Sequence, residues 1–287
     1  MKWQRGTRND DVVDVRGRRR PVGRIAAGGI GVTILVAVVA QLLGVDLSGL
    51  FSGGGGGTSQ PSQQLSTPEP PTGDDPEAEM VDFIRFVMAD IQDTFEIEFK
   101  AAGKDYRRSK LYVFREAIDT ACGLSSSAIG PFYCPGDEKA YIDLSFFRDL
   151  KARFGAPGDF AQAYVLAHEM GHHVQNLNGV EKQPGRMSRD ERSRNAASVK
   201  QELQADCYAG VWGHHARGKK LLEIGDLEEA LKAAEAIGDD RLQTRAGVEV
   251  DPETFTHGTS AQRMKWFRRG FDAGKLEACD TYSASDL

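Results

Sequence analysis

The segment His168-Glu169-Met170-Gly171-His172 contains residue types that can bind a metal ion and catalyse hydrolysis. On an α-helix, residues four apart lie one turn above each other on the same face, so both imidazoles can reach one cation. Glu169 lies about 100° around the helix from His168, where it can act on a water molecule at the metal instead of ligating the metal. This spacing predicts a zinc site with Glu169 as general base. The motif also occurs by chance on solvated helix faces, so a third ligand is needed.

A second polar pair lies farther along the chain, in the stretch Gln201–Cys207. A catalytic zinc ion has three protein ligands and one open position. Glu202 and Asp206 are four apart and share a helix face, although such pairs are also common on solvated helices. Glu202 can ligate the metal, while Asp206 can accept the far-side N–H of a ligating histidine. We therefore predict His168, His172 and Glu202 as ligands of one zinc ion per chain, with Asp206 supporting a histidine.

The spacing of these residues resembles the gluzincin arrangement of thermolysin-type metallopeptidases. More closely, Ala167–Gln175 together with Glu202–Cys207 is similar to the bacterial neutral zinc metallopeptidase family, and the similarity extends to Met1–Arg16 and His257–Arg263. The resemblance implies an α+β, zincin-like fold and hydrolysis of peptide bonds. It does not supply a substrate.

The resemblance also implies a second catalytic residue. The oxyanion that develops during hydrolysis needs a donor besides the metal, and gluzincins commonly place a histidine there from a downstream segment. His257 is the candidate for this role, with Tyr208 as a weaker alternative. A structural role for His257 is equally open, because Thr259–Gln262 is typical of a capping box that begins a helix.

Hydrophobic periodicity predicts the elements that position these residues. We expect helices at 80–99, 159–176 and 196–216, a polar loop at 181–194, and strands at 111–114 and 140–144. Gly171 would cost about 1 kcal/mol relative to alanine inside a helix, which indicates close backbone packing beneath the metal. In zincins an edge strand upstream of the zinc helix pairs with substrate, so the resemblance implies that Phe132–Cys134 is the substrate-binding edge. The prolines on either side of it are tolerated at sheet edges.

Residues 25–45 form an apolar run without a charged residue, long enough to cross the hydrocarbon core of a bilayer. The 24 residues before it carry eight Lys or Arg against three Asp, whereas the whole chain has a net charge of −6. Because positive charge stays cytoplasmic, we expect residues 1–24 to be a cytoplasmic basic tail and 25–45 to be a single-pass transmembrane helix. The run is longer than the apolar region of a signal peptide and has no clear cleavage site after it, which favours an uncleaved anchor.

Residues 46–76 are rich in Gly, Ser, Gln and Pro, a composition that cannot bury a core, and we interpret them as a flexible linker. Residues 77–287 are then an extracytoplasmic domain at the cell membrane. Its four cysteines suggest two disulfides, with three pairings open. Cys122 with Cys134 would close a short loop, and Cys207 would then pair with Cys279. Cys207 could instead be a small buried apolar residue.

The expected partners are a peptide or protein substrate and, through residues 25–45, the lipid bilayer. The basic tract directly adjoins the apolar run, so it indicates membrane topology and not nucleic-acid binding. Two other functions are open: a zinc-dependent adaptor that binds envelope peptides without cutting them, and a hydrolase of a non-peptide amide. Glu169 argues against the adaptor, because a pure binding site needs no general base.

Overall fold

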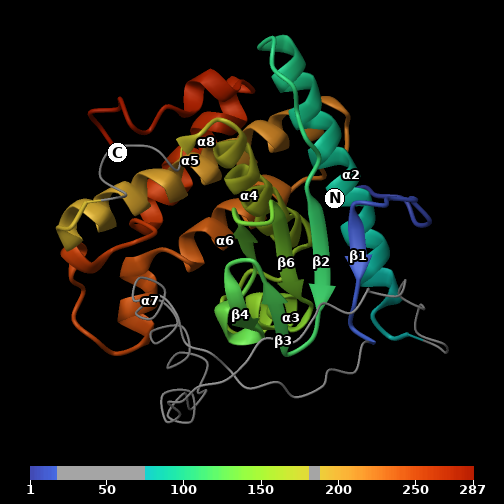
Figure 1. The fold of residues 1–287 in the computed structure, drawn as a ribbon, viewed down its shortest axis with the longest axis horizontal. Helices are drawn as coiled ribbons and strands as arrows, with labels where there is room; N and C mark the ends of the chain where they lie inside the picture. Colours follow the sequence, from blue (N-terminus) through green and yellow to red (C-terminus); the bar gives the residue numbers. More distant parts are fainter. Residues whose placement is uncertain (18–74, 181–187) are drawn as a thin grey trace, which may run out of the picture.

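A mixed four-stranded sheet in the order β1-β2-β6-β5 runs through the domain (Figure 1). The computed structural model describes residues 1–17, 75–180 and 188–287. Strands β1 (Val12–Asp14), β2 (Lys110–Phe114) and β6 (Lys139–Asp143) are parallel, and β5 (Phe132–Cys134) pairs antiparallel with β6. The two strands expected from the sequence are confirmed to within one residue. The expectation that 132–134 is an extended piece at a sheet edge is confirmed as well.

The two faces of the sheet bury different side chains, because successive residues of a strand point to opposite faces. One face carries Leu111, Val113, Ala140 and Ile142 and packs against helices α2 (Ala78–Ala101) and α4 (Asp159–Leu177). The other face carries a smaller cluster around Tyr141, next to the hairpin of β3 (Ala117–Thr120) and β4 (Gly123–Ser126). Helix α4, which carries the segment His168–His172, contacts both β5 and β6.

Most of the other described helices form a second layer on the side of α4 away from the sheet, in the gold to red part of the chain in Figure 1. They are α5 (Glu191–Gly218), α6 (Asp226–Ala236), α7 (Asp239–Arg245) and α8 (Ser260–Ala273), while the short α3 (Ser145–Ala152) follows β6. The expected start of the second zinc helix at 196 was wrong. Helix α5 begins five residues earlier because the Asp190 carboxylate accepts a hydrogen bond from the Ser193 N–H at 2.8 Å and caps the helix.

Two disulfides cross-link the domain, as the sequence suggested. Cys122 pairs with Cys134, which joins the β3–β4 hairpin to the end of strand β5. Cys207 pairs with Cys279, which joins α5 to the turn at Leu276–Cys279. The interpretation of Cys207 as an unpaired apolar residue was therefore wrong.

Residues 1–17 complete the sheet of the domain. Leu111 N–H donates to the Asp11 carbonyl at 2.7 Å and Val15 N–H donates to the Val113 carbonyl at 2.8 Å. The nearly buried Arg16 guanidinium forms ion pairs with Asp14, Asp75 and Glu77 at 2.6–2.8 Å, and so ties this segment to the start of α2. A single-pass span at 25–45 would put β1 and β2 on opposite sides of the bilayer. The expected topology and this strand pairing therefore exclude one another.

The apolar run at 25–45 and most of the linker lie outside the described residues. Within residues 1–17, 75–180 and 188–287, no helix has both the length and the apolar character needed to cross a membrane.

Candidate metal and catalytic site

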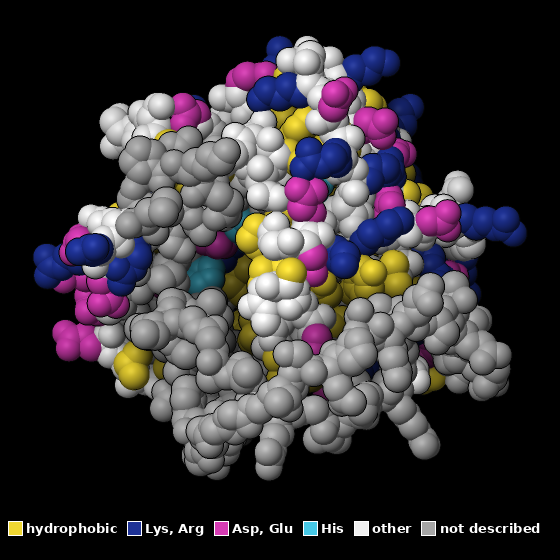
Figure 2. Space-filling view, viewed as in Figure 1, with side chains coloured by type: hydrophobic (Ala, Val, Ile, Leu, Met, Phe, Trp, Pro, Cys, Tyr) yellow, Lys and Arg dark blue, Asp and Glu magenta, His cyan; other side chains and the backbone are white. Residues whose placement is uncertain are grey.

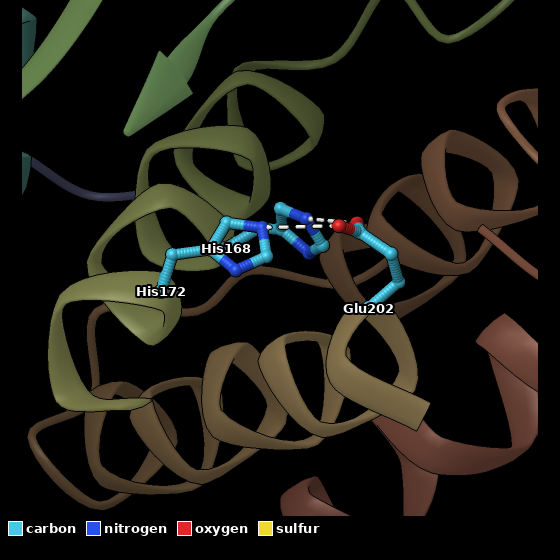
Figure 3. Close-up of side chains that lie close together, drawn as sticks. All are labelled: His168, His172 and Glu202. Atoms are coloured by element: carbon cyan, nitrogen blue, oxygen red, sulfur yellow. Dashed lines mark hydrogen bonds and ion pairs between the residues drawn. The ribbon is translucent and has the colours of Figure 1, made fainter. Parts of the chain in front are cut away.

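His168 and His172 point from α4 toward Glu202 of the neighbouring helix α5 (Figure 3). His168 Nε2 lies 3.1 Å from Glu202 Oε2, and His172 Nε2 lies 3.5 Å from Glu202 Oε1. The ligand atoms of the three residues all lie within 4.8 Å of one another. The structure thus brings together the three side chains that the sequence predicts as metal ligands.

Hydrogen bonds at the far nitrogens fix both imidazole tautomers. His168 Nδ1 lies 2.9 Å from Asp206 Oδ1, and a carboxylate can only accept, so Nδ1 carries the proton. His172 Nδ1 lies 2.9 Å from Gln175 Oε1. The Gln175 amide is oriented because its Nε2 donates to the Gln201 carbonyl at 2.7 Å. Nε2 of each histidine is therefore the ring nitrogen that faces Glu202 and that a metal ion can bind.

This donor set fits a zinc ion. Two imidazole nitrogens and one carboxylate are the ligands that zinc takes in many hydrolytic sites. Burial would lower the pKa of His168, but Asp206 and Glu202 outweigh it and raise that pKa to about 10. Burial would raise the pKa of Glu202, but His172 and His168 outweigh it and hold that pKa well below its ordinary value. The surroundings therefore stabilise positive charge at the ligand atoms, as a divalent cation requires.

Asp206 is fully buried and is held as a carboxylate by Arg263 of α8. Arg263 Nε donates to Asp206 Oδ2 at 2.7 Å, and Nη2 donates to Oδ1 at 2.9 Å. The Tyr164 hydroxyl donates to Oδ1 at 2.5 Å. Burial would raise the pKa of Asp206, but Arg263 and His168 outweigh it and lower the pKa to about 2. The predicted partner of a ligating histidine is thus in place, and Arg263 is a contributor that sequence reasoning missed.

Gly171 allows the two zinc helices to approach closely. A Cβ at Gly171 would lie 2.9 Å from the Ala205 carbonyl oxygen and 3.1 Å from the Ala205 Cα. Real Cβ atoms avoid the shorter separation, so any larger residue would push α4 and α5 apart. The prediction of close backbone packing beneath the metal is confirmed.

A cleft of about 380 Å³ opens above these ligands. On the face shown in Figure 2, histidine and acidic side chains lie together in a hollow. Glu169 and Arg263 line the cleft with the three ligands, and Phe132 and Tyr133 of the edge strand line it from the sheet. Burial raises the pKa of Glu169, which brings this carboxyl closer to the range of a general base that works near neutral pH.

His257 also lines the cleft, and Asp239 holds it there. Asp239 Oδ1 lies 3.1 Å from His257 Nδ1, while Oδ2 accepts the backbone N–H groups of Thr256, His257 and Gly258 at 2.6–3.0 Å. Burial would lower the pKa of His257, but Asp239 and Glu202 outweigh it and raise that pKa, which favours a protonated donor. The capping box expected at Thr259–Gln262 is also present. Tyr208 is not among the described residues that line the cleft.

The chain is similar to a known protein family over almost its whole length. The family described as "Putative neutral zinc metallopeptidase" matches residues 1–282. The chain belongs to this family. "Uncharacterized protein YpfJ" of Escherichia coli K12 is 45% identical over an alignment of 298 residues. The alignment covers 99% of this chain and all of the relative.

A mycobacterial protein matches a shorter part of the chain. "Uncharacterized protein Rv2575" of Mycobacterium tuberculosis H37Rv is 46% identical over 193 residues, which cover 63% of this chain and 65% of the relative. No solved structure matches the chain.

Proposed function

We propose that this family member is a zinc-dependent peptidase that hydrolyses peptide bonds in the cleft between strand β5 and helix α4. The observation that carries the proposal is the convergence of two oriented Nε2 atoms and one carboxylate, with Glu169 lining the same cleft. One zinc ion held by His168, His172 and Glu202 would acidify a water molecule and polarise the scissile carbonyl when bound.

The chain's own residues account for the proton transfers. Glu169 takes a proton from the attacking water and delivers it to the leaving amine, so it acts as general base and then as general acid. His257 donates a hydrogen bond to the carbonyl oxygen as negative charge develops there, and Asp239 stabilises the protonated imidazole. Asp206 and Arg263 keep His168 Nε2 directed at the metal position. The outer edge of β5, which pairs with no other described strand, can pair with an extended substrate backbone.

The test is cleavage profiling of a peptide mixture by the full-length protein in detergent, with mass-spectrometric detection. A truncation at residue 77 is unsuitable because it removes β1 from the sheet. We expect cuts that stop when a chelator removes zinc and return when zinc is added back. No cuts by folded, zinc-loaded protein would overturn the peptidase. Peptide binding without cutting would then support the adaptor, and turnover of a non-peptide amide would support the other alternative.

We also propose that the protein is attached to the membrane through residues 25–45, with residues 1–17 and the domain on the same side. The apolar run supports the attachment, and the β1–β2 pairing supports the common side. Lys2 and Lys220 are both exposed and can report on this arrangement. A membrane-impermeant amine reagent applied to spheroplasts should label both lysines or neither. Labelling of Lys220 without Lys2 would instead support the single-pass topology.

A further inference from the structure

The side chain of His173 makes two hydrogen bonds and is fully buried, although it follows the ligand His172 directly. Its Nε2 lies 2.5 Å from the Arg107 carbonyl oxygen. Because a carbonyl oxygen only accepts, Nε2 carries the proton and Nδ1 is the acceptor of the neutral ring. The Tyr133 hydroxyl therefore donates to Nδ1, at 3.0 Å. The same hydroxyl accepts a hydrogen bond from Asn176 Nδ2 at 3.1 Å.

These contacts join helix α4, which carries two of the proposed metal ligands, to strand β5, the proposed substrate-pairing strand. His173 lies about 100° around α4 from the zinc ligand His172, and Asn176 lies one turn after His172, at about 40° on the side toward His173. Tyr133 is the middle residue of the edge strand β5. One turn of α4 thus presents a metal ligand to the cleft and two hydrogen-bonding groups to the strand.

The opposite face of β5 is fixed by different contacts. Phe132 stacks on Tyr141 of β6 with ring centroids 5.0 Å apart, and Cys134 is bonded to Cys122. Since side chains alternate along a strand, Phe132 and Cys134 face away from α4 while Tyr133 faces it. Within β5, the Tyr133 hydroxyl therefore provides the polar link to the zinc helix.

We propose that Tyr133, His173 and Asn176 form a clamp that sets the distance between the substrate-pairing strand and the zinc ligands. The three are positioning residues: they align the substrate backbone with the metal and do not contribute to metal binding. This inference rests on the proposed peptidase function. It extends that function by assigning a role to a buried histidine outside the ligand set.

The test is Tyr133→Phe in the full-length protein, which removes the hydroxyl and keeps the ring. A misplacement of about 1 Å can cost about 100-fold in rate, so we expect kcat/KM for a cleaved peptide to fall about 10- to 100-fold. Zinc stoichiometry and affinity should not change. Amide hydrogen exchange of residues 132–134 should become faster. Tyr112→Phe is the matched control, because Tyr112 lies on β2, which β6 separates from β5.

Each outcome supports or overturns the proposed clamp. Unchanged kcat/KM and unchanged exchange at 132–134 would overturn the clamp. Loss of zinc in parallel with activity would also overturn it, because the hydroxyl would then act through the metal site. If the unmutated protein cuts no peptide, the peptidase proposal fails, and the exchange measurement alone shows whether Tyr133 holds the strand. An equal loss of kcat/KM in Tyr112→Phe would assign the effect to general destabilisation.

Discussion

Glu169→Gln should lower kcat for peptide hydrolysis by about 10²- to 10⁴-fold while the protein keeps its zinc. The amide has nearly the same shape as the carboxylate but cannot take a proton from the attacking water. Glu169 is outside the cluster of ligand atoms formed by His168, His172 and Glu202, so its replacement leaves the metal ligands intact. The measurement is the initial rate on a peptide identified by cleavage profiling, together with zinc content by atomic emission.

Glu228→Gln is the matched control for this experiment. It makes the same chemical change at an exposed position of α6, and the rate should not change. A Glu169→Gln protein with normal kcat would rule out Glu169 as general base. A variant that had lost zinc would show that Glu169 contributes to metal binding, and the two roles would need to be reassigned.

Gly210→Ala should lower the free energy of unfolding by about 3 kcal/mol, near the upper end for overpacking. A Cβ at Gly210 of α5 would lie 2.0 Å from the carbonyl oxygen of Phe267 in α8. A Cβ at Gly270 of α8 would lie 1.9 Å from the carbonyl oxygen of Cys207 in α5. The two helices therefore meet backbone to backbone. An added methyl group must force them apart, and this displaces Arg263 from Asp206.

Urea denaturation of the full-length protein measures this effect, and Gly218→Ala is the matched control. Gly218 is the last residue of α5, and an added Cβ there meets no atom within 4 Å. The control should leave the midpoint of unfolding almost unchanged. Equal midpoints for the two variants would show that α5 and α8 tolerate a wider separation than the structure has. A selective loss of zinc affinity in Gly210→Ala is also expected, because Asp206 would lose its fixed position.

The residues of the metal site could be predicted from the sequence because their geometry is local. His168 with His172, and Glu202 with Asp206, are each four apart, and helical periodicity alone puts each pair on one face. The unusual helical Gly171 likewise indicated a close approach before its neighbour Ala205 was known. The strands expected at 111–114 and 140–144 followed from local runs of aromatic and β-branched residues, whereas the α+β class was implied by the family resemblance.

Contacts between segments far apart in the chain could not be predicted from local sequence patterns. Strand β1 is only three residues long and has no periodicity to detect, so its place beside β2 depends on long-range pairing. Arg263 is 57 residues from Asp206, so no local pattern in the sequence indicates that the two side chains meet. The roles proposed for Asp239 and Tyr133 depend on their contacts with His257 and His173, which are distant in the sequence. The sequence by itself determined which residues can hold and use a metal ion, whereas the tertiary structure decided which groups orient them, because side-chain orientation depends on neighbours far along the chain.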